Sequence, residues 1–188
     1  MPDIIDIAAK LPSDLASKHR RLRPVEAIRY FVVHYDGVAV PPPGRKGVPG
    51  YDPIGRYAAQ ARYHMQRNWN SGDGPKIAGF GLMYHYRVSA GGGIWRTQPE
   101  EVVTWHARTA NYAGLALCCD LGPGQIPSPE QLRSLKALLD WLCYDRPDIP
   151  AGRADVWGHG ELHRQGNRTA CPGELLEWVQ LYRKGLVV

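Results

Sequence analysis

The chain has 188 residues, of which 44% are hydrophobic and 22% are charged. This length suits one domain with a sizeable core, and the composition excludes disordered, collagen-like and coiled-coil proteins. The 23 basic and 18 acidic residues give a net charge of +5, which suggests an anionic partner such as nucleic acid or bacterial cell wall.

Neither a membrane span nor an export sequence is recognisable. The longest apolar runs are only a few residues, as at 31–33, and are too short to cross a bilayer. The N-terminus lacks a basic region followed by an apolar core, so we expect no secretory signal.

No C-x-x-C pair occurs, and we expect most cysteines to be reduced, as in a protein made in the cytosol. The cysteines are Cys118, Cys119, Cys143 and Cys171.

Residues 1–26 form a polar lead-in that ends in a basic cluster. We expect a solvated N-terminal extension here, followed by the main domain over residues 27–188. Uncharged residues interrupt the basic run, so it is a weak pattern for nucleic-acid binding. The basic residues are Lys18, Arg20, Arg21 and Arg23.

Hydrophobic residues from position 27 onward alternate with the period of a strand. Both faces of this strand are largely apolar, which is typical of a central strand covered by helices on each side. A loop rich in proline and glycine follows at 40–50. The two faces are Ile28, Tyr30, Val32 and His34, and Phe31, Val33 and Tyr35.

Helices and further strands follow along the chain. Asp52 before Pro53 predicts the start of one helix, a capping box at Ser128 predicts a second, and a third begins after Gly173. Strands are predicted at 82–88, 94–97, 113–119 and 154–158, with a hairpin between the first two. These elements predict the α/β class, as a single domain with a central mixed β-sheet flanked by helices.

Two predicted strands end in a histidine, and a cysteine follows nearby. His34 ends the first strand, His159 follows the strand at 154–158, and Cys171 precedes Pro172. The ends of central strands are where open α/β sheets hold ligands. Two imidazoles and one thiolate suit Zn²⁺ and leave its fourth position open for water.

Five short motifs together are more specific than any one alone. They are Phe31-Val32-Val33-His34; Met83-Tyr84-His85-Tyr86; Trp105-His106-Ala107 followed by Asn111; Gly158-His159-Gly160-Glu161-Leu162; and Arg168-Thr169-Ala170-Cys171-Pro172-Gly173. In this set and order the chain resembles the type 2 N-acetylmuramoyl-L-alanine amidases. This family includes phage lysozymes with amidase activity and the peptidoglycan recognition proteins. The resemblance spans residues 27–183.

The resemblance implies a zinc ion bound by His34, His159 and Cys171. His163 is an alternative to His159, because its spacing of eight residues from the cysteine is common in the phage and recognition-protein branches. We favour His159, since a rigid strand end can aim an imidazole whereas His163 would lie within a flexible loop.

The resemblance also implies two catalytic residues, Tyr84 and Thr169. Strand alternation puts Tyr84 and His85 on opposite faces, so we predict that Tyr84 faces the metal and that His85 is structural. Some relatives have lysine at the position of Thr169. A threonine hydroxyl lacks that positive charge but can still donate a hydrogen bond to a developing oxyanion.

Acidic residues help to place the chain within the family. Relatives with a catalytic glutamate carry it seven residues after the position of Asn111, which is Cys118 here. That acid is therefore absent, and the phage-lysozyme branch is the closer match. Glu161 is either a carboxylate acting near His159 or a supporting or surface acid.

His106 and Asn111 lie on the loop before the strand predicted at 113–119. The resemblance implies that both contact substrate in a cleft and do not bind the metal. The alternative for His106 is a structural role as a partner of Trp105.

The implied reaction is zinc-dependent hydrolysis of the amide bond between N-acetylmuramic acid and L-alanine of the peptidoglycan stem peptide. The alternative is a non-catalytic peptidoglycan-binding module, although binding-only relatives lack zinc ligands that this chain has. We expect peptidoglycan as the partner, no nucleic acid, no stable membrane association and a monomer. The missing export sequence favours a phage endolysin, held in the host bacterial cytoplasm until it is released to the cell wall.

Overall fold

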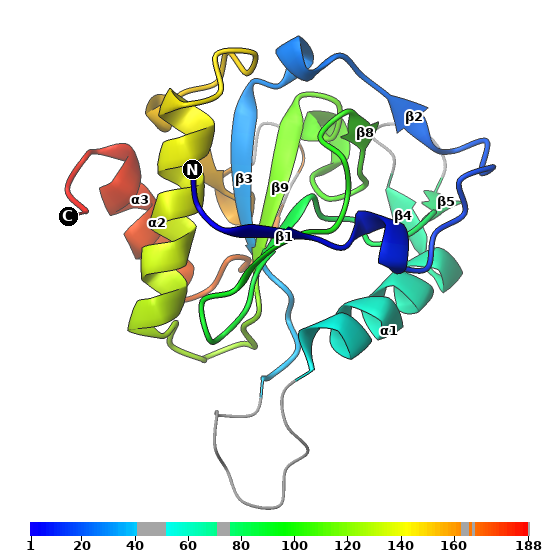
Figure 1. Ribbon diagram of the computed structural model, residues 1–188, viewed down its shortest axis with the longest axis horizontal. Coiled ribbons are helices and arrows are strands. Elements are labelled where there is room, and N and C mark those ends of the chain that lie inside the picture. The colour runs from blue at the N-terminus through cyan, green and yellow to red at the C-terminus, as the bar shows by residue number, and fades with distance from the viewer. Residues whose placement is uncertain (41–51, 71–75, 163–165, 167, 188) are drawn as a thin grey trace, which may run out of the picture.

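A mixed six-stranded sheet lies at the centre of the computed structural model, which describes residues 1–40, 52–70, 76–162, 166 and 168–187 (Figure 1). Across the sheet the strands are β1 (Ile4–Asp6), β7 (Ile94–Arg96), β6 (Tyr86–Val88), β9 (Gly114–Cys119), β3 (Tyr30–Tyr35) and β10 (Val156–Gly158). β6 and β7 pair antiparallel, as the predicted hairpin requires, and the other neighbours in this sheet pair in parallel. The predicted α/β class with a mixed sheet is confirmed.

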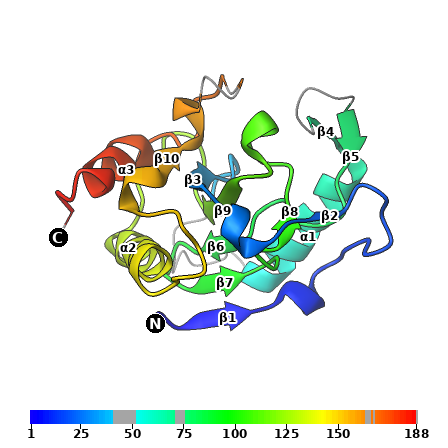
Figure 2. The same ribbon diagram turned by 90° about the horizontal axis from the view of Figure 1, so that it is seen from above.

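Helices cover both faces of the sheet (Figure 2). They are α1 (Pro53–Gln66), α2 (Pro129–Tyr144) and α3 (Leu175–Arg183). α2 and α3 share one face, where Leu138 and Val179 belong to the same buried cluster as Phe31 of β3. α1 lies on the other side, and its Tyr57 belongs to a second buried cluster with Ile7. Within the described part of the chain, no helix has both the length and the apolar character needed to cross a bilayer.

The two faces of β3 have different surroundings. Phe31 and Val33 point into the core formed with α2 and α3. Val32 belongs to a separate small cluster with Ala107, on the face that also carries His34. These four of the six β3 side chains are at most 2% exposed. The strand is therefore buried on both sides as predicted, and His34 is a polar residue within an otherwise apolar strand.

The strand predicted at 82–88 is shorter than expected, because β6 begins only at Tyr86. Side chains form hydrogen bonds with backbone groups that a longer strand would pair with its neighbour. The Met83 N–H donates to the ring of His64, and the Leu82 carbonyl accepts from the Gln98 amide. Tyr84 and His85 therefore lie outside regular structure, and strand alternation is not what orients them.

The N-terminal residues are part of the domain, so the expectation of a solvated extension over residues 1–26 is wrong. β1 adds a parallel strand to the sheet edge beside β7, and Ile7 and Leu11 are buried. β2 (Arg21–Leu22) pairs antiparallel with β8 (Val102–Val103). Arg23, one of the four residues of the basic cluster, is only 3% exposed. The apolar residues of this segment stand among polar ones, so the sequence pattern did not indicate that the segment packs into the domain.

Short elements complete the described chain. β4 (Asn68–Asn70) and β5 (Lys76–Ala78) form a small antiparallel pair. The 3₁₀ helices are Ala8–Lys10, Val25–Ala27, Arg108–Ala110, Arg153–Asp155 and His159–Glu161. Most of the loop predicted at 40–50 lies outside the described residues.

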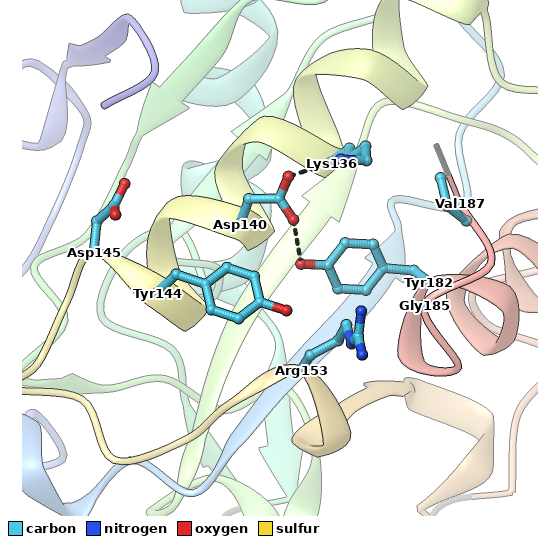
Figure 3. Close-up of a pocket in the computed structure, with 8 residues that line it drawn as sticks. All are labelled: Lys136, Asp140, Tyr144, Asp145, Arg153, Tyr182, Gly185 and Val187. Carbon is cyan, nitrogen blue, oxygen red and sulfur yellow. Dashed lines mark hydrogen bonds and ion pairs between the residues drawn. The ribbon is translucent and has the colours of Figure 1, made fainter.

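Helix α2 begins where the sequence predicts. The Ser128 hydroxyl accepts from the Gln131 N–H, but the Gln131 side chain donates to the Val88 carbonyl of β6 instead of closing a capping box. Further along, the Asp140 carboxylate accepts from Lys136 and from the Tyr182 hydroxyl of α3 (Figure 3). These bonds tie α2 to the sheet at one end and to α3 at the other.

A buried arginine holds three strands and α1 together. Arg87 of β6 is fully buried and pairs with Asp120, which follows β9, and with Asp36, which follows β3. The Tyr57 hydroxyl of α1 donates to Asp120 at 2.8 Å. The Gln60 side chain, also on α1, accepts from Arg87. The cluster therefore fastens α1 to the carboxyl ends of β3 and β9.

Replacing Arg87 by methionine leaves the Asp120 carboxylate buried without its cation, whereas Asp36 still pairs with Arg56. We expect Arg87→Met to lower the free energy of unfolding by about 3–5 kcal/mol, the usual cost of removing one partner of a buried ion pair. The matched control is Arg133→Met on the exposed face of α2, which should leave unfolding nearly unchanged. Urea denaturation of the three proteins measures the difference, and equal midpoints for both variants would contradict the role assigned to Arg87.

Candidate metal centre

Two parallel strands bring His34 and His159 to the same edge of the sheet. β10 pairs with β3 in the register that aligns Gly158 with Val33. The residues that follow these two, His159 and His34, therefore lie beside each other. The ring centroids of His34 and His159 are 4.5 Å apart. His159 is the first residue of the 3₁₀ helix His159–Glu161 that follows β10. The alternative ligand His163 lies outside the described residues.

Cys171 approaches the two histidines from a loop before α3. Its Sγ is 3.7 Å from His34 Nδ1 and accepts from the Tyr35 N–H at 3.4 Å. The Cys171 carbonyl accepts from the Gly160 N–H at 2.6 Å, which joins this loop to the segment that carries His159. Backbone contacts on both sides therefore fix the position of the thiol.

The geometry and chemistry of these three residues fit zinc. Their ligand atoms lie within 4.8 Å of one another. Ligand atoms of a tetrahedral zinc ion bound by sulfur and imidazole nitrogen are about 3.6 Å apart, close to the spacing of Cys171 Sγ and His34 Nδ1. A thiolate and two imidazoles also form a donor set that suits zinc better than magnesium or calcium.

Burial controls the protonation of these groups. It raises the pKa of the Cys171 thiol to about 12 and lowers the pKa of His34 well below its usual value. The low pKa keeps the His34 imidazole neutral, as a metal ligand must be. A cation beside Cys171 would oppose the effect of burial and favour the thiolate.

His106 lies behind His34 and contacts it directly. The distance from His106 Nδ1 to His34 Nε2 is 3.0 Å, and His106 Nε2 is 3.3 Å from the carbonyl oxygen of Gly114. The side chain is 6% exposed, and burial lowers its pKa to about 3. Both ring nitrogens thus have protein partners. Substrate contact by His106 stays a prediction, whereas the observed contacts orient His34.

Asn111 supports the loop that carries His106. Its side-chain oxygen accepts from the N–H groups of His106 at 2.8 Å and Ala107 at 2.5 Å, and the residue is 2% exposed. These bonds shape the loop from inside. Contact between Asn111 and substrate likewise stays a prediction.

Tyr84 and Thr169, the two predicted catalytic residues, flank the cluster. The Tyr84 ring centroid is 5.3 Å from that of His34, and burial raises the pKa of its phenol. Thr169 is exposed, and its hydroxyl oxygen accepts from the Cys171 N–H at 3.1 Å. The structure therefore brings Tyr84 close to His34 and ties Thr169 to Cys171.

A cavity of about 560 Å³ lies beside Tyr84. The face of α1 toward β4 forms one wall, and charged and aromatic side chains line it. They are Asp36, Arg56, Tyr63, His64, Arg67, Trp69 and Tyr84, with Val38, Ala59 and Gln60. A second cavity of about 370 Å³, between α2 and α3, contains none of the predicted site residues (Figure 3).

His64 is a site-lining residue that the sequence analysis missed. It is 3% exposed, and its Nδ1 accepts from the Met83 N–H at 3.1 Å. Its spacing from Tyr57 and Ala61, seven and three residues away, is that of one helix face and could have identified it.

His85 and Glu161 have structural partners. His85 Nδ1 accepts from the Ala116 N–H of β9, and its Nε2 is 2.8 Å from the Val102 carbonyl. Glu161 pairs with Arg183 of α3 and accepts from the Gly158 N–H at 2.7 Å. Burial raises the pKa of Glu161, but these bonds outweigh it and the net shift is downward. Glu161 thus holds the turn after β10 against α3.

Comparison with known families identifies the family of the chain. The family model for N-acetylmuramoyl-L-alanine amidase matches residues 23–174, which include all the predicted site residues. The chain belongs to this family. No curated protein gives a match.

Solved structures of the amidase fold superpose on almost the whole chain. N-acetylmuramoyl-L-alanine amidase LysC from Clostridium intestinale URNW is 20% identical, with a TM-score of 0.66 and 100% of both chains covered. The endolysin of Thermus scotoductus MAT2119 bacteriophage Ph2119 is 22% identical, with a TM-score of 0.60, over 97% of this chain and 99% of that one. Drosophila PGRP-LB is 15% identical, with a TM-score of 0.65, over 99% and 96%. At these identities the likeness shows the fold.

His64 should make the stability of this amidase sensitive to acid. Its pKa is about 3 in the folded protein because of burial, against about 6.5 in the unfolded chain. Between these values only the unfolded chain binds the proton, so stability falls as the pH drops below 6.5. At pH 5.5 the loss from this residue is about 1 kcal/mol.

The variant His64→Asn keeps an acceptor for the Met83 N–H but does not titrate. Urea denaturation at pH 7.5 and 5.5 should show a smaller loss of stability in the variant than in the wild type. Equal losses in the two proteins would mean that His64 is protonated in the folded state.

Proposed function

We propose that this protein is a zinc-dependent amidase that cleaves the bond between N-acetylmuramic acid and L-alanine in peptidoglycan. The observation that carries the proposal is the cluster of His34, His159 and Cys171, whose ligand atoms lie within 4.8 Å of one another. Membership of the N-acetylmuramoyl-L-alanine amidase family supports the choice of substrate.

Residues of three segments would hold the metal. His34 and His159 offer imidazole nitrogens, and Cys171 offers a thiolate, which leaves a fourth position for water or substrate. Bound zinc supplies a Lewis acid and lowers the pKa of water toward about 7. Because Cys171 is needed as a ligand, it does not act as a nucleophile.

Tyr84 and Thr169 would stabilise the negative charge that develops on the scissile carbonyl oxygen. Burial keeps Tyr84 a neutral phenol, so its O–H is available to donate. The Thr169 oxygen already accepts from the Cys171 N–H, so its own hydrogen is the one left to donate toward substrate. The cavity beside Tyr84 offers space for substrate groups next to the reacting bond.

The biological setting proposed here is that of a phage endolysin. The protein would act as a monomer, stay in the host cytoplasm until another protein breaches the membrane, and then degrade the cell wall. The shared fold with the endolysin of phage Ph2119 supports this setting. Neither a nucleic acid nor a membrane surface is needed for the reaction.

The function is tested with purified cell walls, incubated with the protein with and without a chelator. We expect turbidity to fall only without the chelator, and mass analysis to find released stem peptides that begin with a free L-alanine. Products with an intact muramyl-alanine bond would refute the amidase. Tight binding to walls without release of peptides would support a peptidoglycan-binding module instead.

Replacing the Cys171 thiol should abolish zinc binding in a protein that still folds. We expect Cys171→Ala to lose zinc, measured by atomic absorption, together with wall hydrolysis. Cys143→Ala is the matched control, because this half-buried cysteine lies on α2 away from the cluster. Full zinc content in Cys171→Ala would show that the thiol is not a ligand.

Tyr84→Phe removes one hydroxyl and keeps the ring beside His34. We expect kcat to fall about 10²–10³-fold, the usual effect of removing one oxyanion donor, while zinc content stays constant. Tyr144→Phe on α2 is the control, since Tyr144 is exposed and lies outside the candidate centre. An unchanged kcat in Tyr84→Phe would remove Tyr84 from the mechanism.

A further inference from the structure

Arg23 is a buried cation whose donors point almost entirely at the backbone. Its Nε donates to the Glu100 carbonyl at 3.1 Å. Its Nη1 lies within hydrogen-bond distance of three carbonyl oxygens, those of Asn111 at 3.1 Å, Tyr112 at 2.6 Å and Gly114 at 2.9 Å. Arg23 thus fixes the chain just before β9 and at its first residue.

Gly114 connects this arginine to His106. Its carbonyl oxygen accepts from Arg23 and lies 3.3 Å from His106 Nε2. A Cβ at this position would lie 3.0 Å from His106 Cε1 and 2.9 Å from the Ala110 carbonyl oxygen. Only glycine leaves the imidazole enough room to lie against the backbone here.

Hydrogen-bond direction is determined along the whole series of contacts. A carbonyl can only accept, so Nε2 of the neutral His106 ring carries the hydrogen and Nδ1 carries a lone pair. That lone pair faces His34 Nε2 at 3.0 Å, so His34 Nε2 must carry the hydrogen. His34 Nδ1 is then left with its lone pair, and it is the atom that lies 3.7 Å from Cys171 Sγ.

We propose that Arg23, Gly114 and His106 form a positioning relay that holds His34 in the Nε2–H tautomer, with Nδ1 directed at the metal position. The inference rests on the proposed zinc site and assigns three residues to its support. Arg23 and His106 are positioning residues, because neither touches the metal position. The relay also gives the N-terminal segment a role in the centre, through a residue 11 positions before His34 in the sequence.

The tautomer of His34 is measured first, in zinc-free protein labelled with ¹⁵N-histidine. Long-range ¹H–¹⁵N correlation spectra distinguish the two neutral forms of each ring. We expect His34 to be in the Nε2–H form in the wild type and to mix both forms in His106→Leu. An Nδ1–H form in the wild type would overturn the relay.

Zinc affinity is measured next, by competition with a chromophoric chelator. Loss of such a supporting hydrogen bond commonly weakens metal binding 10–100-fold, which we expect for His106→Leu. His106→Asn should recover part of the loss, because its side-chain oxygen can accept from His34 in place of Nδ1. Equal affinity of the wild type and His106→Leu would overturn the proposal.

Arg23 is tested by Arg23→Lys, which keeps the charge but cannot bond several carbonyls at once. We expect weaker zinc binding than in the wild type, with thermal unfolding showing that the variant is folded. The control is Arg29→Lys, since Arg29 also donates to backbone carbonyls, those of Glu26 and Ile28, but is exposed and does not contact Gly114. Equal effects of the two variants would contradict a role for Arg23.

These measurements separate the relay from the proposed function. If the wild type binds no zinc, the proposed enzyme is wrong, and the tautomer in the zinc-free protein still decides whether the relay exists. If the wild type binds zinc and cleaves cell walls but His106→Leu keeps its affinity, the relay alone is wrong.

Discussion

The buried charge of Arg87 is the constraint on which the architecture depends. A guanidinium with no exposed surface requires carboxylates beside it, and Asp36 and Asp120 reach it from the ends of β3 and β9. The Tyr57 hydroxyl bonds to Asp120, so α1 can pack only where this cluster holds it. Because β3 ends in His34 and Tyr35 just before Asp36, the same interaction fixes the strand end that carries the first candidate ligand.

The candidate centre lies on the same face of the sheet as the Arg87 cluster. α2 and α3 cover the opposite face with a continuous apolar core, which leaves His34 facing loops and polar groups. Parallel register with β10 places His159 beside it, and Cys171 arrives on the loop held by Gly160. On the far side of His34, His106 joins it to Gly114 and Arg23. One rigid strand end thus connects the candidate ligands to their supporting residues.

Structure that depends on a local residue pattern could be predicted from the sequence. Alternation over residues 28–35 predicts a strand buried on both faces, and β3 is buried in this way. Residues 1–26 lack such a pattern, because β1 and Arg23 pack into the domain although their neighbours are polar. The strand predicted at 82–88 is too long, because the partners of that backbone are side chains from α1 and from the segment after β7.

The sequence by itself determined the α/β class and the family resemblance, since both depend on residue types at short spacing. Through that resemblance it also gave His34, His159 and Cys171 as candidate ligands, with His163 as the alternative to His159. Only the tertiary structure decided what Arg23, His64, Arg87 and His106 do. Their partners lie far along the chain, as with Arg23, whose carbonyl acceptors are 77 to 91 residues away. A hydrogen bond between distant segments depends on how strands pair and helices pack, and neither is encoded in the residues next to the donor.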